Sequence, residues 1–181
     1  MIAAQWFFIV FRILHIGAGM VWVGSVFFLV MFVQPSAAAI APAGAPFMAE
    51  LLGARRLVDR ILIIASVTIV AGLILYLRDM NDAGGFGDFL GTNYGVAMTI
   101  GGVTAIAAFL VGLFGTRPAV QRLLALGREI ASSEGPPSPD LPAEVPTLQV
   151  PALQDLTKIL ARISLGLLGI TIIAMATARY W

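Results

Sequence analysis

The sequence predicts an all-α fold, an integral membrane four-helix bundle with a short cytoplasmic interfacial helix and a Pro-rich loop. Two observations support this prediction. First, 59% of the 181 residues are hydrophobic and 12% are charged, whereas soluble domains carry about 45–50% apolar and about 25% charged residues. Second, four stretches approach the about 20 mostly apolar residues that a helix needs to cross a bilayer. We therefore expect the lipid bilayer to be the solvent of this chain.

The four stretches are expected to form a single transmembrane domain over residues 1–181. The predicted spans cover residues 6–33, 61–77, 95–115 and 159–178, with a cytoplasmic loop over residues 116–158. At about 1.5 Å per residue the first span would reach roughly 40 Å, more than a hydrocarbon core of about 30 Å. It should therefore tilt or project at one end. An amphipathic lead-in from Phe47 to Arg60 would extend the helix of the second span.

Basic residues divide unequally between the two sides of the predicted spans. The loops after the first and third spans, together with the start of the fourth span, hold eight of the eleven Lys and Arg residues, whereas the opposite side holds Arg12, Arg78 and Arg179. Cytoplasmic loops carry the excess of Lys and Arg, so both termini are expected on the outer side. The eight basic residues are Arg55, Arg56, Arg60, Arg117, Arg122, Arg128, Lys158 and Arg162.

The loop between the third and fourth spans has two parts. Residues 118–132 carry apolar side chains at helical spacing, which predicts a short amphipathic helix lying on the membrane surface. Residues 135–151 contain six prolines, a composition typical of an extended, polyproline-like linker. This linker is either a flexible tether or a docking strip for a partner subunit.

Composition also limits the possible chemistry. The chain has no Cys, which excludes disulfides, thiolate metal sites and iron–sulfur clusters. Its net charge of +1 leaves no basic excess for nucleic acid. We find no catalytic triad, carboxylate pair or phosphate-binding loop. No catalytic residue is therefore assigned; whether the chain is an enzyme stays open, and the absence of a catalytic activity of its own is favoured.

The first span carries two ionisable residues in an apolar setting. Arg12 and His15 are three residues apart and share a helix face, as does Trp22, seven residues beyond His15. Ala18 and Gly19 fall between them and should leave room for a flat group beside the imidazole. Ionisable residues inside a span are costly and usually functional. His15 is interpreted either as a cofactor or metal ligand, or as a hydrogen-bonding residue whose partner on a neighbouring helix is Ser66, Thr68, Thr99 or Thr104.

The run Arg12-x-x-His15-Ile16-x-Ala18-Gly19-x-x-Trp22-Val23-Gly24 resembles the first-helix signature of the copper-resistance D (CopD) superfamily. That group includes HemJ-type protoporphyrinogen oxidases, and the run is also similar to the membrane part of PuuD-type urate-oxidising proteins. The resemblance implies haem b or copper chemistry, with His15 as the haem or metal ligand. It implies cofactor-binding roles for Arg12, Gly19 and Trp22 as well, with Arg12 suited to a haem propionate.

The chain also departs from these families. It has a single His, so one chain cannot supply bis-histidine ligation, and Lys158, its only Lys, lies at a span boundary instead of inside a later span as in HemJ-type proteins. HemJ-like catalysis is therefore disfavoured.

Three functional hypotheses follow. In the first, the chain binds haem b and supports membrane redox or electron transfer, with a second axial ligand from another copy, a partner subunit or Met98. In the second, it is a non-catalytic accessory subunit of a larger respiratory or photosynthetic complex, where His15 could instead hold a chlorophyll-type pigment. In the third, it imports copper. Each places a multi-pass protein in the bacterial inner membrane, with a second copy or other membrane subunits as partners.

Overall fold

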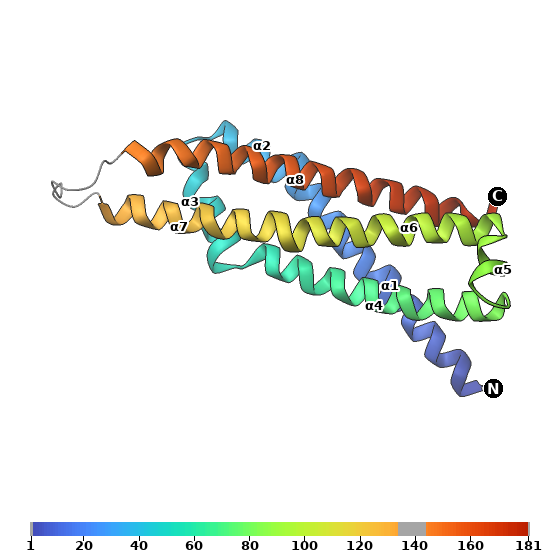
Figure 1. Ribbon diagram of the computed structural model, residues 1–181. Coiled ribbons are helices and arrows are strands. Elements are labelled where there is room, and N and C mark those ends of the chain that lie inside the picture. The colour runs from blue at the N-terminus through green and yellow to red at the C-terminus, as the bar shows by residue number, and fades with distance from the viewer. Residues whose placement is uncertain (1, 134–143, 181) are drawn as a thin grey trace.

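The structure, a computed structural model that describes residues 2–133 and 144–180, consists of long helices running side by side (Figure 1). Within these residues there is no strand. Four helical segments are long and apolar enough to cross a membrane: Gln5–Ala39, Leu57–Asp82, Asn93–Ser132 and Gln149–Tyr180. The prediction of an all-α fold built on four apolar helices is therefore confirmed.

The first segment is a continuous helical rod. Helix α1 (Ile2–Phe28) runs into a π-helical turn, η1 (Leu29–Val33), and then into α2 (Gln34–Ala39). In Figure 1, α1 crosses α4 obliquely and its N-terminal part projects away from the other helices. Helix α1 is therefore inclined to α4, and its tilt relative to a bilayer stays a prediction.

The expectation that Phe47 to Arg60 would extend the helix of the second span holds only for residues 57–60; the segment before them is broken. This segment forms α3 (Gly44–Ala49) and a π-helical turn, η2 (Glu50–Ala54), and α4 (Leu57–Asp82) begins separately. Between them Arg56 has a φ of 50°, in the left-handed region. A residue in that conformation cannot continue a right-handed helix, so the chain changes direction there and α4 starts afresh.

The third segment is longer than predicted. After the short helix α5 (Phe86–Leu90), α6 (Asn93–Leu110) continues through a π-helical turn, η3 (Val111–Thr116), into α7 (Arg117–Ser133). This helical segment of 40 residues corresponds to about 60 Å, roughly twice the hydrocarbon thickness of a bilayer.

The prediction of a separate helix lying on the membrane surface over residues 118–132 is wrong. Helix α7 extends α6 in nearly the same direction (Figure 1), and it packs against α8 (Glu144–Thr177), which ends in the 3-10 turn η4 (Ala178–Tyr180). Ala119 and Val120 are buried. Leu123, Leu124 and Ile130 are half-buried. The apolar side of α7 is therefore at least partly covered by protein instead of lying wholly on lipid.

The Pro-rich stretch is only partly extended linker. Residues 134–143 lie outside the described residues, but α8 is helical from Glu144 and includes Pro151 in its interior. The expectation of an extended chain is thus wrong for residues 144–151. Pro146 falls in the first turn, where a backbone N–H has no partner within the helix, so a proline there costs little.

All four long segments contribute to the core. Its buried residues are Trp22, Ile61, Ala65, Ala105, Ala108 and Leu168. Three of these six are alanines, and small residues at helix contacts allow close backbone approach. The core therefore depends on close packing between helices around three large side chains, Trp22, Ile61 and Leu168.

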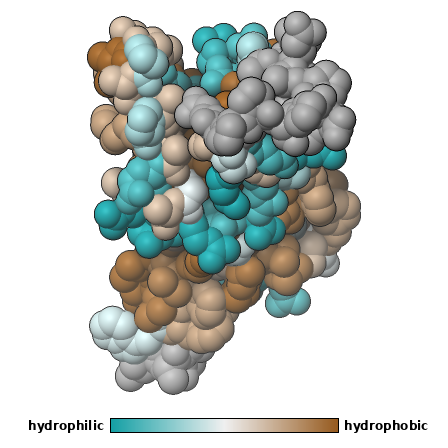
Figure 2. Space-filling model, turned by 90° about the vertical axis from the view of Figure 1, so that its left-hand side faces the viewer, coloured by the Kyte–Doolittle hydropathy of each residue, from teal (hydrophilic) through white to brown (hydrophobic). Residues whose placement is uncertain are grey.

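The two ends of the molecule are formed by different elements. Both termini and α5 lie at one end, whereas α2, α3 and the α7–α8 hairpin lie at the other (Figure 1). Figure 2 views the hairpin end, where hydrophilic side chains gather across the middle of the face and hydrophobic ones lie below them. The two basic loops identified from the sequence thus belong to a single end of the molecule.

Candidate functional site on the first helix

His15 lies on the side of α1 that faces α4. Its Nδ1 is 2.8 Å from the backbone carbonyl oxygen of Thr68. A carbonyl oxygen accepts only, so Nδ1 carries the hydrogen and donates it to Thr68. The hydrogen bond to a neighbouring helix, one of the two interpretations made from the sequence, is therefore present. Its acceptor is the backbone carbonyl of Thr68 and not the hydroxyl.

Gly72 allows the imidazole to lie directly against α4. A β-carbon at residue 72 would stand 2.6 Å from Cε1 and 2.7 Å from Nδ1 of His15. Those distances are far shorter than a van der Waals contact, so the ring occupies space that any other residue would need. The hydrogen bond and this contact together fix the position and orientation of the ring.

The other ring nitrogen of His15, Nε2, has no hydrogen-bond partner among the residues that the structure describes. With the hydrogen on Nδ1, the neutral ring carries its lone pair on Nε2, and no hydrogen bond to Nε2 occurs among the described residues. Metal-ligating histidines show this arrangement, since they donate one ring N–H to a carbonyl or carboxylate and use the other nitrogen as the ligand.

Gly19 and Trp22 share the α4-facing side with His15, as the spacing predicts, but they pack instead of lining an open space. A β-carbon on Gly19 would be 3.5 Å from Cγ2 of Thr68, and Trp22 is 4% exposed within the core. Helix α4 therefore occupies the room that Ala18 and Gly19 were expected to leave for a flat group. The predicted cofactor contacts of Gly19 and Trp22 stay predictions, without support from this packing.

Arg12 lies one turn from His15 and is exposed. It forms no ion pair or side-chain hydrogen bond with any residue that the structure describes. Its guanidinium donors are therefore available to an anionic group, as the resemblance to haem-binding families implies.

Further hydrogen bonds connect the other helices. The hydroxyls of Tyr76 and Thr99 are 2.8 Å apart, as are those of Thr104 and Thr171. Thr99 and Thr104, both considered from the sequence as partners of His15, thus bond to other residues. Because these contacts lie within apolar helices, where polar side chains hold neighbours together, their role is structural.

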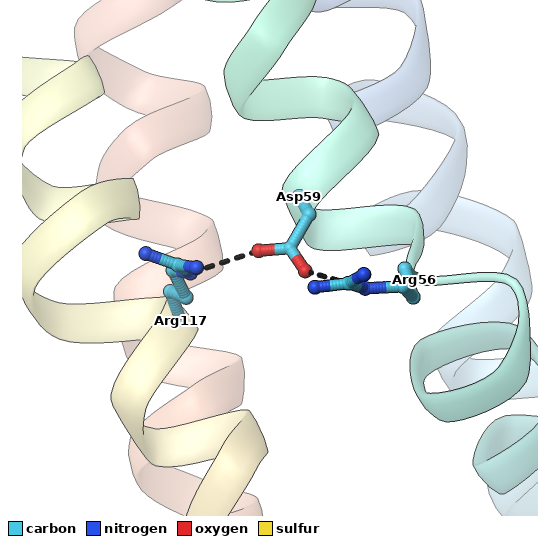
Figure 3. A network of polar contacts seen from close by, with 3 residues as sticks. All are labelled: Arg56, Asp59 and Arg117. Carbon is cyan, nitrogen blue, oxygen red and sulfur yellow. Dashed lines mark hydrogen bonds and ion pairs between the residues drawn. The ribbon is translucent and has the colours of Figure 1, made fainter.

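Sequence analysis missed a polar cluster at the basic end of the bundle. Asp59, in the first turn of α4, accepts from Nε of Arg56 at 3.2 Å and from Nε of Arg117 at 2.8 Å. Figure 3 shows the carboxylate between the two guanidinium groups. The sequence did contain a signal for this cluster, because Asp59 stands among Arg55, Arg56 and Arg60. Those arginines were considered only as indicators of membrane orientation.

A bare metal ion would need more ligands than His15 supplies. Within the described residues there is no group of three or more His, Cys, Asp or Glu side chains that could hold a metal ion. A haem iron needs fewer protein ligands than a bare metal ion, because the porphyrin provides four nitrogen ligands and the protein supplies only the axial ones.

Comparison with known proteins adds no relative to this description: no protein-family model, curated protein or solved structure matches the chain. The resemblance of the first helix to the CopD superfamily therefore stays a prediction from the sequence.

Proposed function

We propose that this chain is a multi-pass protein of the bacterial inner membrane that binds haem b through Nε2 of His15 and supports electron transfer. The observation that carries the proposal is the fixed imidazole of His15. Its Nδ1 donates to the carbonyl of Thr68 at 2.8 Å, its ring rests on Gly72, and its Nε2 accepts no hydrogen bond from any described residue. An imidazole held in this way loses little conformational freedom when it binds an iron, which favours the affinity for haem.

The nitrogen ligand that His15 offers suits one of the two axial positions of a haem iron. The chain has one His and no Cys, so a second His ligand must come from another molecule, and Met98 is the alternative that this chain itself offers. Side chains on α1 near His15 are largely exposed, among them Ile13, Ile16 and Met20, and a second copy or a partner subunit could pack there. We therefore propose a homodimer or a heteromeric membrane assembly in which the haem lies between subunits.

The chemistry of electron transfer would belong to the haem, whose iron accepts and releases single electrons. The protein residues hold and orient it. His15 supplies a neutral nitrogen ligand, the carbonyl of Thr68 keeps the ring hydrogen on Nδ1 and increases the basicity of Nε2, and Arg12 offers a guanidinium to a propionate.

An absorbance spectrum of the purified full-length chain tests the proposal. We expect a Soret band and a pyridine haemochrome of haem b after expression with added haem precursor. His15→Ala should abolish both. Gly17→Ala is the matched control, because a β-carbon there would meet nothing within 4 Å. A chlorophyll-type pigment would give red absorption bands instead. A wild-type protein without bound haem, or a His15→Ala variant that keeps it, would refute the proposal.

A second candidate function is that of a non-catalytic subunit in a larger membrane complex. It is favoured by the α7–α8 hairpin, which continues well beyond the length needed to cross a bilayer, and which carries a groove of about 470 Å³ lined by residues of both helices. On this hypothesis the hydrogen bond from His15 to Thr68 only joins two helices. Co-purification of further subunits without haem would favour this function, whereas a lone, monodisperse chain in mild detergent would contradict it.

A further inference from the structure

A second groove lies at the basic end of the bundle, between the start of α4 and the junction of α6 with η3 and α7. Its volume is about 480 Å³. Its lining divides into an apolar wall and a charged mouth. The wall comprises Leu62, Ile63, Phe109 and Leu113, together with Ser66, whose hydroxyl donates to the carbonyl of Leu62 on its own helix. The mouth comprises Arg56, Asp59, Arg60 and Arg117.

The mouth carries an excess of positive charge. Three guanidinium groups face one carboxylate, which gives a net charge of +2 (three minus one). Asp59 engages Arg56 and Arg117 through their Nε atoms, as Figure 3 shows. Each guanidinium has five N–H donors, so both keep terminal N–H groups for another acceptor. Arg60 forms no ion pair with any described residue. The mouth therefore suits an anion with several oxygen acceptors, such as a phosphodiester.

The groove also straddles the expected boundary between hydrocarbon and headgroups. Its wall residues fall inside the spans predicted from the sequence, residues 61–77 and 95–115, whereas its charged residues fall just outside them. A ligand that satisfies both parts must combine an acidic headgroup with an acyl chain. An acidic peptide would leave the apolar wall uncovered, and a zwitterionic lipid would leave the excess charge of the arginines unbalanced.

We propose that this groove binds an anionic phospholipid, with its phosphate at Arg56, Arg60 and Arg117 and an acyl chain along Leu62 and Phe109. The bound lipid would connect α4 to the α6–α7 junction, next to the Asp59–Arg117 ion pair that already joins them. This inference requires the membrane insertion included in the proposed function, but it does not depend on haem or on His15.

Native mass spectrometry of the full-length chain in mild detergent tests the proposal. Phosphatidylglycerol and phosphatidylcholine with identical acyl chains are titrated separately, and inorganic phosphate is added in a third series. We expect retention of phosphatidylglycerol over phosphatidylcholine and no displacement by phosphate at equal concentration, because phosphate cannot use the apolar wall. Arg60→Gln should weaken phosphatidylglycerol binding about fivefold, corresponding to the about 1 kcal/mol that a basic residue contributes near an anionic surface.

Arg128→Gln is the matched control, since it makes the same charge change on exposed α7 but does not line this groove. Its phosphatidylglycerol affinity should equal that of the wild type. Equal retention of the two lipids, competition by inorganic phosphate, or equal losses in Arg60→Gln and Arg128→Gln would overturn the proposal. None of these results depends on a Soret band, so failure of lipid binding and failure of haem binding are distinguishable.

Discussion

The imidazole of His15 occupies the space in which a side chain of residue 72 would stand: a β-carbon on Gly72 would lie 2.6 Å from Cε1 of the ring. This relationship joins the one histidine of the chain to a glycine 57 residues away in the sequence. It also means that the position of the candidate ligand is determined by α4, a helix that shows no functional signature of its own.

Gly72→Ala should therefore displace the ring of His15 and break its hydrogen bond to Thr68. We expect a loss of about 1–3 kcal/mol in the free energy of unfolding, as for other overpacked sites, together with weaker haem retention. Denaturation in mixed detergent micelles and the Soret absorbance measure the two effects. In a His15→Ala background the added methyl group meets no ring, so Gly72→Ala should cost almost nothing there. An equal cost in both backgrounds would contradict the packing described.

Gly101 and Gly102 offer a matched pair for testing the α6–α8 contact. A β-carbon on Gly101 would lie 2.6 Å from Cγ of Met175, whereas one on Gly102 would meet nothing within 4 Å. Gly101→Ala should destabilise the protein by about 1–3 kcal/mol. Gly102→Ala should be neutral or stabilising by up to about 1 kcal/mol, because alanine favours helix more than glycine does. Denaturation of both variants in the same detergent checks the difference, and equal stabilities would refute it.

Asp59 should contribute to stability through Arg117 more than an ordinary surface ion pair does. Its side chain is 25% exposed and bridges two arginines, whereas Asp155 is 68% exposed and pairs with Lys158 on the same helix. We expect Asp59→Asn to cost about 1 kcal/mol and Asp155→Asn less than about 0.5 kcal/mol. A double-mutant cycle with Arg117→Gln isolates the contact between α4 and α7. A coupling energy near zero would show that the pair contributes nothing.

Local composition was sufficient to predict the four apolar helices and the shared face of His15, Gly19 and Trp22, because both follow from hydrophobicity and helical periodicity. It could not predict which helix that face would contact, because the residues of α4 that meet His15, Gly72 and the backbone of Thr68, carry no sequence signal for that contact. The same limit explains why the prediction for α7 was wrong. Its amphipathic pattern is equally compatible with a lipid surface and with a partner helix, and only the presence of α8 beside it decides between them.

The break at Arg56 had no local signal either. A left-handed residue is usually glycine or asparagine, and the sequence has arginine there. The ion pair of Arg56 with Asp59 at 3.2 Å holds its side chain over the first turn of α4. That contact could not be deduced from the sequence, because it depends on how the chain enters α4.

The absence of Cys from the chain allows a direct test of topology by single-cysteine labelling in intact cells and inverted vesicles. The α6–η3–α7 rod, at about 60 Å, exceeds the hydrocarbon core by roughly 30 Å, and the basic end is expected in the cytoplasm. Gly127→Cys, on α7, should therefore react with a membrane-impermeant maleimide only in inverted vesicles, and Asn81→Cys, near the C-terminal end of α4, only in intact cells. Val103→Cys, in the middle of α6, should stay unlabelled in both. Labelling of Gly127→Cys in intact cells would reverse the orientation, and labelling of Val103→Cys would show that α6 does not cross the bilayer.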